Sequence, residues 1–520
     1  MYGLYFFGLC RFLVILCCKY KQLFSILYIF VAKKFKKSMI FSFFAQKMAE
    51  KLQFTPNNLQ KEAMNLLSEF IFGSSMRDRI FVLRGYAGTG KTSLVGALVK
   101  VLDEAKMPVQ LMAPTGRAAK VFASMAGHPA FTIHKTIYRQ HRFNVEMEGF
   151  ELTENRRTGV LFICDEASMI STLNEGSPFG TGNLLDDLIE FVYGSQGCKL
   201  LLVGDAAQLP PVGQKRSPAL DINVLQSYGL EVVTTELTEV ARQQMTSGIL
   251  YNATVLRNTL MMGMNAPAES ATAQRLYALP HIYYKMYPDV HRINGYELLE
   301  CLGSSYSNEG LDDTIIITRS NARANKFNQG VRNQILDREE ELTAGDRLLV
   351  VKNNYYWGKE FDQLPFIANG DVVTVNRVRS VISLYGFRFA KVAITLPDYD
   401  IDTEVIVMLD TLTVDGPNLP VEQQQKLFEA VAQDYPECRN QRDLYKAVKE
   451  NPYFNALQVK YAYCVTCHKS QGGQWQDVYL DLAYINPDHL GPDFYRWIYT
   501  AFTRARKSLY LVNMSDEMTE

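Results

Sequence analysis

The chain has 520 residues, of which 47% are hydrophobic, so it is long enough to form three or four domains with cores of their own. Its 54 basic and 55 acidic side chains give a formal net charge of −1, which excludes binding of nucleic acid through an overall positive field. A polynucleotide site would have to be a local basic groove. The nine cysteines are scattered and odd in number, which is typical of reduced thiols in a cytoplasmic protein.

Residues 1–47 differ from the rest, because they carry eight basic side chains and no acidic one. Their second apolar run, residues 23–32, is only about ten residues long, whereas roughly 20 are needed to cross a bilayer. We expect a soluble, cytoplasmic chain that begins at Met48, with residues 1–47 as an upstream artefact of the start site. A membrane anchor is the alternative, and only then would the protein be tethered to a membrane.

A predicted amphipathic helix at residues 55–70 precedes a glycine-rich loop. Gln60 on this helix offers a donor and an acceptor together, which suits recognition of adenine. Residues 85–92 fit G-x-x-x-x-G-K-[ST], between apolar runs at 80–83 and 94–99. A strand, a tight turn and a helix N-terminus would close backbone N–H groups around the phosphates of ATP.

Within this loop, Lys91 would reach the β- and γ-phosphates, and the Thr92 hydroxyl would ligate Mg²⁺. The residues that the loop predicts to bind the nucleotide are Gly85, Tyr86, Ala87, Gly88, Thr89, Gly90, Lys91, Thr92 and Ser93.

A second anion-binding geometry follows the phosphate loop. Residues 109–114 are predicted to form a strand, and the helix start at residues 115–120 offers Thr115 and Arg117 to a phosphate. His134 and Lys135 lie a short distance further along. Residues 143–152 alternate around a turn at 148–149, which predicts a β-hairpin.

Two further apolar runs end in polar residues. Residues 160–164 end in Asp165 and Glu166, at the edge where parallel sheets bind ligands. Asp165 suits the coordination shell of Mg²⁺, and Glu166 would polarise the attacking water. Residues 199–204 lead into a loop in which Gln208 would contact the γ-phosphate. Further on, Arg242 would stabilise the transferring phosphoryl group.

In this order the segments resemble the Q motif and motifs I, Ia, II, III and IV of superfamily 1B helicases, in the Dda-like and RecD-like branch. Residues 465–472 resemble motif V, which explains residues 464–468 better than the haem-attachment pattern C-x-x-C-H that they also match. Residues 499–506 resemble motif VI, which implies that Arg504 is a second arginine on the γ-phosphate. The resemblance implies that Gln474 lies near the sugar of the nucleotide, where relatives often have glutamate.

The resemblance implies an α/β fold of two RecA-like parallel-sheet domains in tandem, with a small SH3-like β-barrel inserted in the second. Short β segments with glycine turns between residues 345 and 409 agree with a barrel. The expected domains are 48–230 (with a hairpin insertion at about 139–158), 231–340 together with 455–520, and the insertion 341–454. No motif is recognisable in residues 255–312.

The function that the resemblance implies is an ATP-dependent DNA helicase that uses Mg²⁺ and moves 5′→3′, in DNA repair, recombination or replication. Single-stranded DNA and duplex or forked DNA are the expected partners, with single-strand-binding or nuclease proteins as further partners. The hairpin would be the wedge that splits the duplex. The residues expected to contact the single strand are Thr115, Arg117, His134, Lys135, Thr466, His468 and Lys469.

Three alternatives remain open from the sequence. The chain could be a DNA-stimulated translocase subunit that unwinds poorly alone. It could be a phosphate-loop kinase, although that leaves motifs III, V and VI unexplained. It could be a membrane-tethered DNA-uptake or mobile-element protein, if residues 1–47 are translated.

Overall fold

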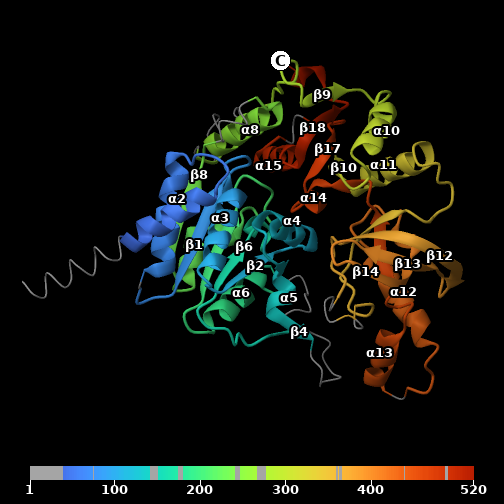
Figure 1. Ribbon diagram of the computed structural model, residues 1–520. Helices are drawn as coiled ribbons and strands as arrows, with labels where there is room; N and C mark the ends of the chain where they lie inside the picture. The colour runs from blue at the N-terminus through green and yellow to red at the C-terminus, as the bar shows by residue number, and fades with distance from the viewer. Residues whose placement is uncertain are drawn as a thin grey trace, which may run out of the picture.

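The computed structural model of the protein describes residues 39–519, except 74, 141–149, 174–179, 240–245, 266–276, 359–360, 362–365, 439 and 487–489. The described residues include two larger sheets and a closed barrel. In Figure 1 the first sheet carries the blue and green colours of the N-terminal half, and the second sheet and the barrel carry yellow to red.

The first sheet is parallel throughout and has the strand order β3-β2-β6-β7-β1-β8. Its strands are buried apolar runs, as expected for a sheet with helices on both faces. Phe81 and Leu83 of β1 pack on one face, and Ile80 and Val82 pack on the other. The strands are β1 (Arg79–Gly85), β2 (Val109–Ala113), β3 (Ala130–Thr132), β6 (Leu161–Cys164), β7 (Lys199–Gly204) and β8 (Glu231–Leu237).

Helices α2 (Asn58–Phe72), α3 (Lys91–Glu104) and α4 (Gly116–Ala126) contribute to one of these two cores. Helices α5 (Ile133–Ile137), α6 (Leu184–Tyr193) and α7 (Ile222–Ser227) contribute to the other. Because β1 leads directly into α3 through the phosphate loop, the loop lies at the C-terminal edge of the sheet, where open α/β sheets bind their ligands.

Residues 39–51 form a further helix ahead of α2. Phe44 and Met48 are buried in the core beside α2, and the Phe44 and Phe72 rings meet edge to face with centroids 4.9 Å apart. The expected limit of the folded chain at residue 48 is therefore too late, because residues 39–47 pack on the first core. None of the helices in the described part of the chain is long and apolar enough to cross a membrane.

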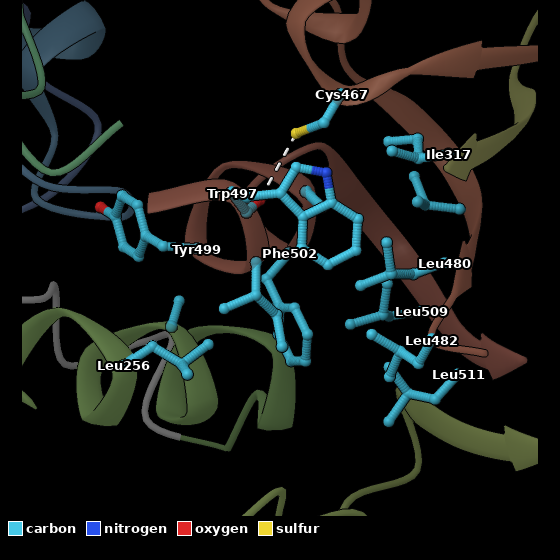
Figure 2. Packing of buried hydrophobic residues seen from close by; sticks show 14 of the residues in the cluster. Leu256, Ile317, Cys467, Leu480, Leu482, Trp497, Tyr499, Phe502, Leu509 and Leu511 are labelled. Atoms are coloured by element: carbon cyan, nitrogen blue, oxygen red, sulfur yellow. Dashed lines mark hydrogen bonds between the residues drawn. The ribbon is translucent and has the colours of Figure 1, made fainter. Parts of the chain in front are cut away.

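The second sheet is also parallel and has the order β16-β10-β17-β18-β9. Its strands are β9 (Val290–Ile293), β10 (Thr314–Thr318), β16 (Cys464–Thr466), β17 (Trp475–Asp481) and β18 (Ala505–Val512). Figure 2 shows the core on one face, where strand residues such as Ile317, Leu480 and Leu509 meet two helices. These helices are α15 (Pro492–Phe502), which carries Trp497 and Phe502, and α8 (Gly248–Asn265), which carries Leu256.

On the other face of the second sheet, α10 (Leu298–Asn308) and α11 (Asn321–Gln334) pack beside the barrel. The barrel closes in the order β11-β12-β13-β14-β15. Its strands are β11 (Arg347–Val350), β12 (Val372–Leu384), β13 (Phe387–Leu396), β14 (Ile401–Met408) and β15 (Leu457–Tyr461). Helices α12 (Val421–Ala432) and α13 (Gln441–Glu450) lie between β14 and β15 in the chain. Two parallel sheets and a later barrel confirm the predicted fold class.

Two strands lie on the other side of an expected domain limit. β8 follows the limit at residue 230 but pairs with β1 in the first sheet, and β15 follows the limit at 454 but closes the barrel against β11 and β14. A buried apolar strand has the same sequence pattern in either sheet, so its pairing partner cannot be predicted from the pattern alone.

A hairpin is present, in which β4 (Tyr138–Gln140) pairs antiparallel with β5 (Phe150–Leu152), so its first strand lies before the predicted range of residues 143–152. Its expected turn at 148–149 lies outside the described residues. The Phe150 ring contacts Tyr355 and Phe366 of the barrel insertion, with centroid separations of 4.9 and 5.7 Å. The base of the hairpin therefore rests against the insertion.

Candidate active site

A cleft of about 700 Å³ lies between the two sheet domains, at the phosphate loop. Of the residues predicted to bind nucleotide, metal or water, those that line it from the first domain are Tyr86, Ala87, Gly88, Gly90, Lys91, Thr92, Ser93, Asp165, Glu166 and Gln208. Gln474 and Arg504 line it from the second domain. The cleft therefore brings together residues more than 400 positions apart in the chain.

The phosphate loop has the left-handed turns that its glycines predict. Gly88 and Gly90 have φ values of 73° and 83°, which side chains other than glycine rarely adopt. Lys91 is the first residue of α3, and its Nζ donates to the carbonyl oxygens of Gly85 and Tyr86 at 2.7 and 2.9 Å. The ammonium thus folds back onto the loop, from where it can turn to a phosphate.

Gln60 lies beneath the phosphate loop and is only 2% exposed. Its Oε1 accepts from the Asn57 N–H in a capping box, and its Nε2 donates to the Thr89 carbonyl at 3.0 Å. In this conformation the amide supports the loop from below, and the contact with adenine stays a prediction. Two side chains that sequence reasoning missed, Lys51 and Phe54, line the cleft beside the loop.

The two carboxylates after β6 differ in their surroundings. Asp165 Oδ1 accepts from the Glu166 N–H at 2.8 Å, and Glu166 has a left-handed backbone with φ of 52°. Burial, together with the Glu166 carboxylate, raises the pKa of Asp165 to about 7. A half-buried carboxylate in the same cleft as the Thr92 hydroxyl suits a hard cation such as Mg²⁺. The described part of the chain holds no cluster of three or more His, Cys, Asp or Glu side chains for a metal. Phosphate and water oxygens would supply the other ligands.

Gln208 is 7% exposed and lines the cleft. Its Oε1 is buried and, among the residues that the structure describes, has no hydrogen-bond partner. Leaving a buried acceptor unpaired is unfavourable by about 1–3 kcal/mol. A water or a nucleotide group in the cleft would provide the missing donor.

The arginines of the cleft come from the second domain. Arg504 is 2% exposed, and its guanidinium donates to the carbonyls of Thr500 and Gly473 at 3.0 and 3.2 Å. Arg506, which was not assigned a role from the sequence, also lines the cleft and donates to Gln474 Oε1 at 2.9 Å. The position of Arg506, two residues after Arg504 in motif VI, could have indicated that it also lies at the cleft. Arg242 lies outside the described residues.

The predicted DNA contacts of the first domain already make contacts within the protein. Thr115 caps α4 by accepting from the Ala118 N–H. The Arg117 guanidinium lies 4.1 Å from the centre of the Trp475 ring in the second domain and donates to the Gln474 carbonyl at 3.4 Å. Burial lowers the pKa of His134 to about 4, so this imidazole is neutral at pH 7. Lys135 is half-buried over the exposed Phe131 ring, 4.8 Å from its centre.

The predicted DNA contacts of the second domain lie around α14 (Cys467–Ser470), which Thr466 precedes. His468 is exposed. The Nζ of Lys469 is buried and, within the described ranges, no acceptor lies within hydrogen-bond distance. Burial and the Lys460 ammonium lower the pKa of Lys469 to about 8. An anion placed there would relieve an unpaired buried charge.

Gly472 of motif V approaches the motif Ia helix, because a side-chain carbon on Gly472 would lie 2.9 Å from Thr115 Oγ1. Thr115, one of the predicted DNA contacts of the first domain, therefore lies beside motif V of the second domain.

Two family models match the chain, in the order in which its motifs occur. The model described as AAA domain matches residues 58–259, and the model described as UvrD-like helicase C-terminal domain matches residues 461–512.

Known relatives cover different shares of the chain. An uncharacterized protein of Acanthamoeba polyphaga mimivirus is 22% identical over 87% of this chain and 99% of its own length. The ATP-dependent RecD2 DNA helicase of Deinococcus radiodurans is 30% identical over 34% of this chain and 21% of its own length. The ATP-dependent DNA helicase dda of Enterobacteria phage T4 is 24% identical over 61% of this chain and 66% of its own length.

Among solved structures, a Pif1 helicase from Bacteroides in complex with ADP-AlF3 and ssDNA is 14% identical, with 90% of this chain and 95% of that chain covered and a TM-score of 0.42. The ordered motifs, the two family models and the RecD2 and Dda relatives together show that this chain is similar to the superfamily 1B helicases, in the Dda-like and RecD-like branch.

Proposed function

We propose that the protein is an ATP-dependent DNA helicase that moves 5′→3′ along single-stranded DNA and separates duplex DNA. The observation that carries this proposal is the composition of the cleft. The phosphate loop, Asp165, Glu166 and Gln208 come from one domain, while Arg504 comes from the other. A nucleotide held between two domains links its hydrolysis to their relative movement.

In the proposed reaction the backbone N–H groups of the phosphate loop and Lys91 hold the β- and γ-phosphates. Thr92 and Asp165 would hold Mg²⁺, which supplies positive charge to the phosphate oxygens. Glu166 accepts a proton from the attacking water, and the unpaired Gln208 Oε1 orients that water by accepting its second hydrogen. Arg504 stabilises negative charge that develops on the γ-phosphate.

The DNA strand would run past α4 of the first domain and α14 of the second. Phosphate contacts of this kind give affinity that depends on salt and not on base sequence. Thr115, Lys135, Thr466, His468 and Lys469 are the contacts that we propose in the conformation described. Arg117 and His134 would take part only after their present contacts, to Trp475 and among the aromatic rings beside Tyr138, have changed.

The proposed direction of travel and DNA substrate rest on the similarity to these helicases. Two of the relatives are named ATP-dependent DNA helicases. We extend that activity, with 5′→3′ movement and a role in repair, recombination or replication, to this chain. We propose the hairpin of β4 and β5 as the element that splits the duplex.

The test is ATP hydrolysis by the 520-residue chain with and without single-stranded DNA, together with unwinding of forks that carry only a 5′ or only a 3′ tail. We expect stimulation by DNA and opening of the 5′-tailed fork alone. Lys91→Ala should abolish both activities, because no other cation of the phosphate loop reaches the γ-phosphate. Stimulated hydrolysis without unwinding would instead indicate a translocase subunit, and hydrolysis indifferent to DNA would contradict the proposal.

A further inference from the structure

The segment Asp205 to Leu209, which carries Gln208, belongs to the first domain but is held from the second. Arg496 of α15 donates from Nη1 to the carbonyls of Ala206 and Gln208 at 2.5 and 3.0 Å. The Leu209 N–H donates to Thr500 Oγ1 at 2.9 Å, and Gln471 Nε2 donates to the Leu209 carbonyl at 2.7 Å. The backbone beside Gln208 is thus fixed by side chains that lie far along the chain.

Tyr499 extends this set of contacts to the phosphate loop. Its hydroxyl donates to Asp205 Oδ2 at 2.6 Å and accepts from the Ala87 N–H at 3.0 Å. The side chain is 1% exposed, and burial together with the Asp205 carboxylate raises its pKa well above the ordinary value, so the hydroxyl remains a donor. In Figure 2 the Tyr499 ring stands apart from Leu480, Leu509 and Leu511, and its oxygen points toward the blue ribbon of the first domain.

The same helix also fixes Arg504. The Thr500 carbonyl accepts from Arg504 Nε at 3.0 Å, while the Thr500 hydroxyl accepts from the Leu209 N–H. One turn of α15 therefore contacts both the backbone that carries Gln208 and the guanidinium that faces the cleft. Movement of α15 away from the first domain would break the Leu209 contact and move Arg504 away from the phosphate loop.

We propose that Tyr499, together with Thr500, is a positioning residue that ties the phosphate loop and the Gln208 segment to the second domain, so that hydrolysis in the cleft is coupled to domain movement. This inference rests on the proposed function. Tyr499 touches no reacting atom in this arrangement. It acts through Asp205 and the backbone of Ala87, and its hydroxyl is the part that matters.

The test compares Tyr499→Phe with Tyr495→Phe in the 520-residue chain. Phenylalanine at 499 keeps the ring in the core but leaves the Ala87 N–H and Asp205 Oδ2 unpaired. Tyr495 lies one turn earlier on α15, is 3% exposed and donates to the Ala278 carbonyl at 2.6 Å, away from the first domain. It therefore controls for loss of a buried hydroxyl from the same helix.

The measurements are kcat and KM for ATP, with and without single-stranded DNA, and the thermal midpoint of each variant. Tyr499→Phe should lower the DNA-stimulated kcat about tenfold, the size expected from loss of a hydrogen bond to a charged group, and leave KM within about twofold. Tyr495→Phe should keep the kcat of the parent protein at a similar thermal midpoint. Thr500→Val, which removes the acceptor of the Leu209 N–H at nearly constant volume, should reproduce the loss of kcat and provides the test if Tyr499→Phe does not fold.

A stimulated kcat that stays within about twofold of the parent in the folded Tyr499→Phe variant would overturn this inference. An equal loss in Tyr499→Phe and Tyr495→Phe would also overturn it, because helix packing alone would then account for the effect. Failure of the proposed function looks different: the parent protein itself would show no stimulation by DNA.

Discussion

At the scale of single residues, Lys469 is where burial and charge conflict most clearly. Its ammonium is enclosed, has no acceptor among the residues described, and lies near the charge of Lys460. An unpaired buried cation destabilises the folded chain, and a bound phosphate would supply the missing partner. Lys469 therefore lowers the stability of the free protein and is suited to bind a phosphate of the DNA backbone.

Replacing Lys469 with methionine should therefore affect stability and DNA binding in opposite directions. The thermal midpoint should hold or rise, because the buried charge is gone. The slope of log Kd against log salt for a single-stranded oligonucleotide should fall by about 0.7, the loss of one phosphate contact. Fluorescence anisotropy of the labelled oligonucleotide at several salt concentrations measures this slope. Lys507→Met removes an exposed ammonium that pairs with Glu309 and should leave the slope unchanged. An unchanged slope for Lys469→Met would contradict the contact.

The pKa of Lys469 also fixes the sign of a pH effect. Its folded-state value of about 8 lies below the ordinary 10.5, so between these two pH values the unfolded chain binds more protons than the folded one. The stability linked to Lys469 therefore rises as the pH increases through this window. Thermal unfolding between about pH 8 and 10 should show a smaller rise for Lys469→Met than for the parent protein. Equal rises would show that Lys469 does not titrate in this window.

At the scale of elements, the helix of residues 39–51 packs on the core of the first domain and contributes to its stability. Phe44 is 6% exposed against the Phe72 ring, whereas its neighbour Phe43 is 62% exposed. Phe44→Ala should lower the stability of the first domain by about 3 kcal/mol, and Phe43→Ala should change it by less than about 0.5 kcal/mol. Urea unfolding followed at the first domain distinguishes the two. Equal and small effects would mean that this helix adds nothing to the core.

Elements were predictable where a local pattern determines them. The strand, loop and helix around Lys91 follow from apolar runs and glycines within about 20 residues, because backbone geometry alone demands those residue types. The helix of residues 39–51 was not predicted, because its few core residues follow a long basic and apolar segment and show no clear helical pattern of their own. β8 was placed in the wrong sheet, because the sequence pattern of a strand does not indicate which strand it pairs with.

The site itself was predictable in its chemistry and less so in its geometry. Lys91, Asp165, Glu166 and Gln208 follow buried strands, and parallel strands present their ends at one edge, so their convergence could be expected. The support that Gln60 gives to the phosphate loop could not be predicted in the same way, because it depends on the approach of the Thr89 carbonyl. That approach is a tertiary contact, which no local spacing encodes.

At the scale of the whole molecule, the contacts between the domains carry the functional argument. Arg117 and the Gln474 carbonyl are 357 positions apart in the chain, yet they meet beside the cleft. From the sequence, Arg117 appears only as a cation at a helix start, and a DNA phosphate is its natural partner there. The structure gives the guanidinium an aromatic face and a carbonyl of the second domain instead, and so assigns it to the junction between domains.

Arg117→Ala decides between these two roles. If Arg117 holds the domains together, the loss of its stacking on Trp475 should lower kcat/KM for ATP about fivefold, because Arg504 reaches the cleft only when the domains are close. The slope of log Kd for DNA against log salt should then not change. Lys120→Ala, which removes an exposed cation from the same helix that pairs with Asp398 of the barrel insertion, should leave both quantities unchanged. A reduced salt slope with normal ATP kinetics would instead indicate that Arg117 contacts the DNA strand, with DNA replacing Trp475 as its partner.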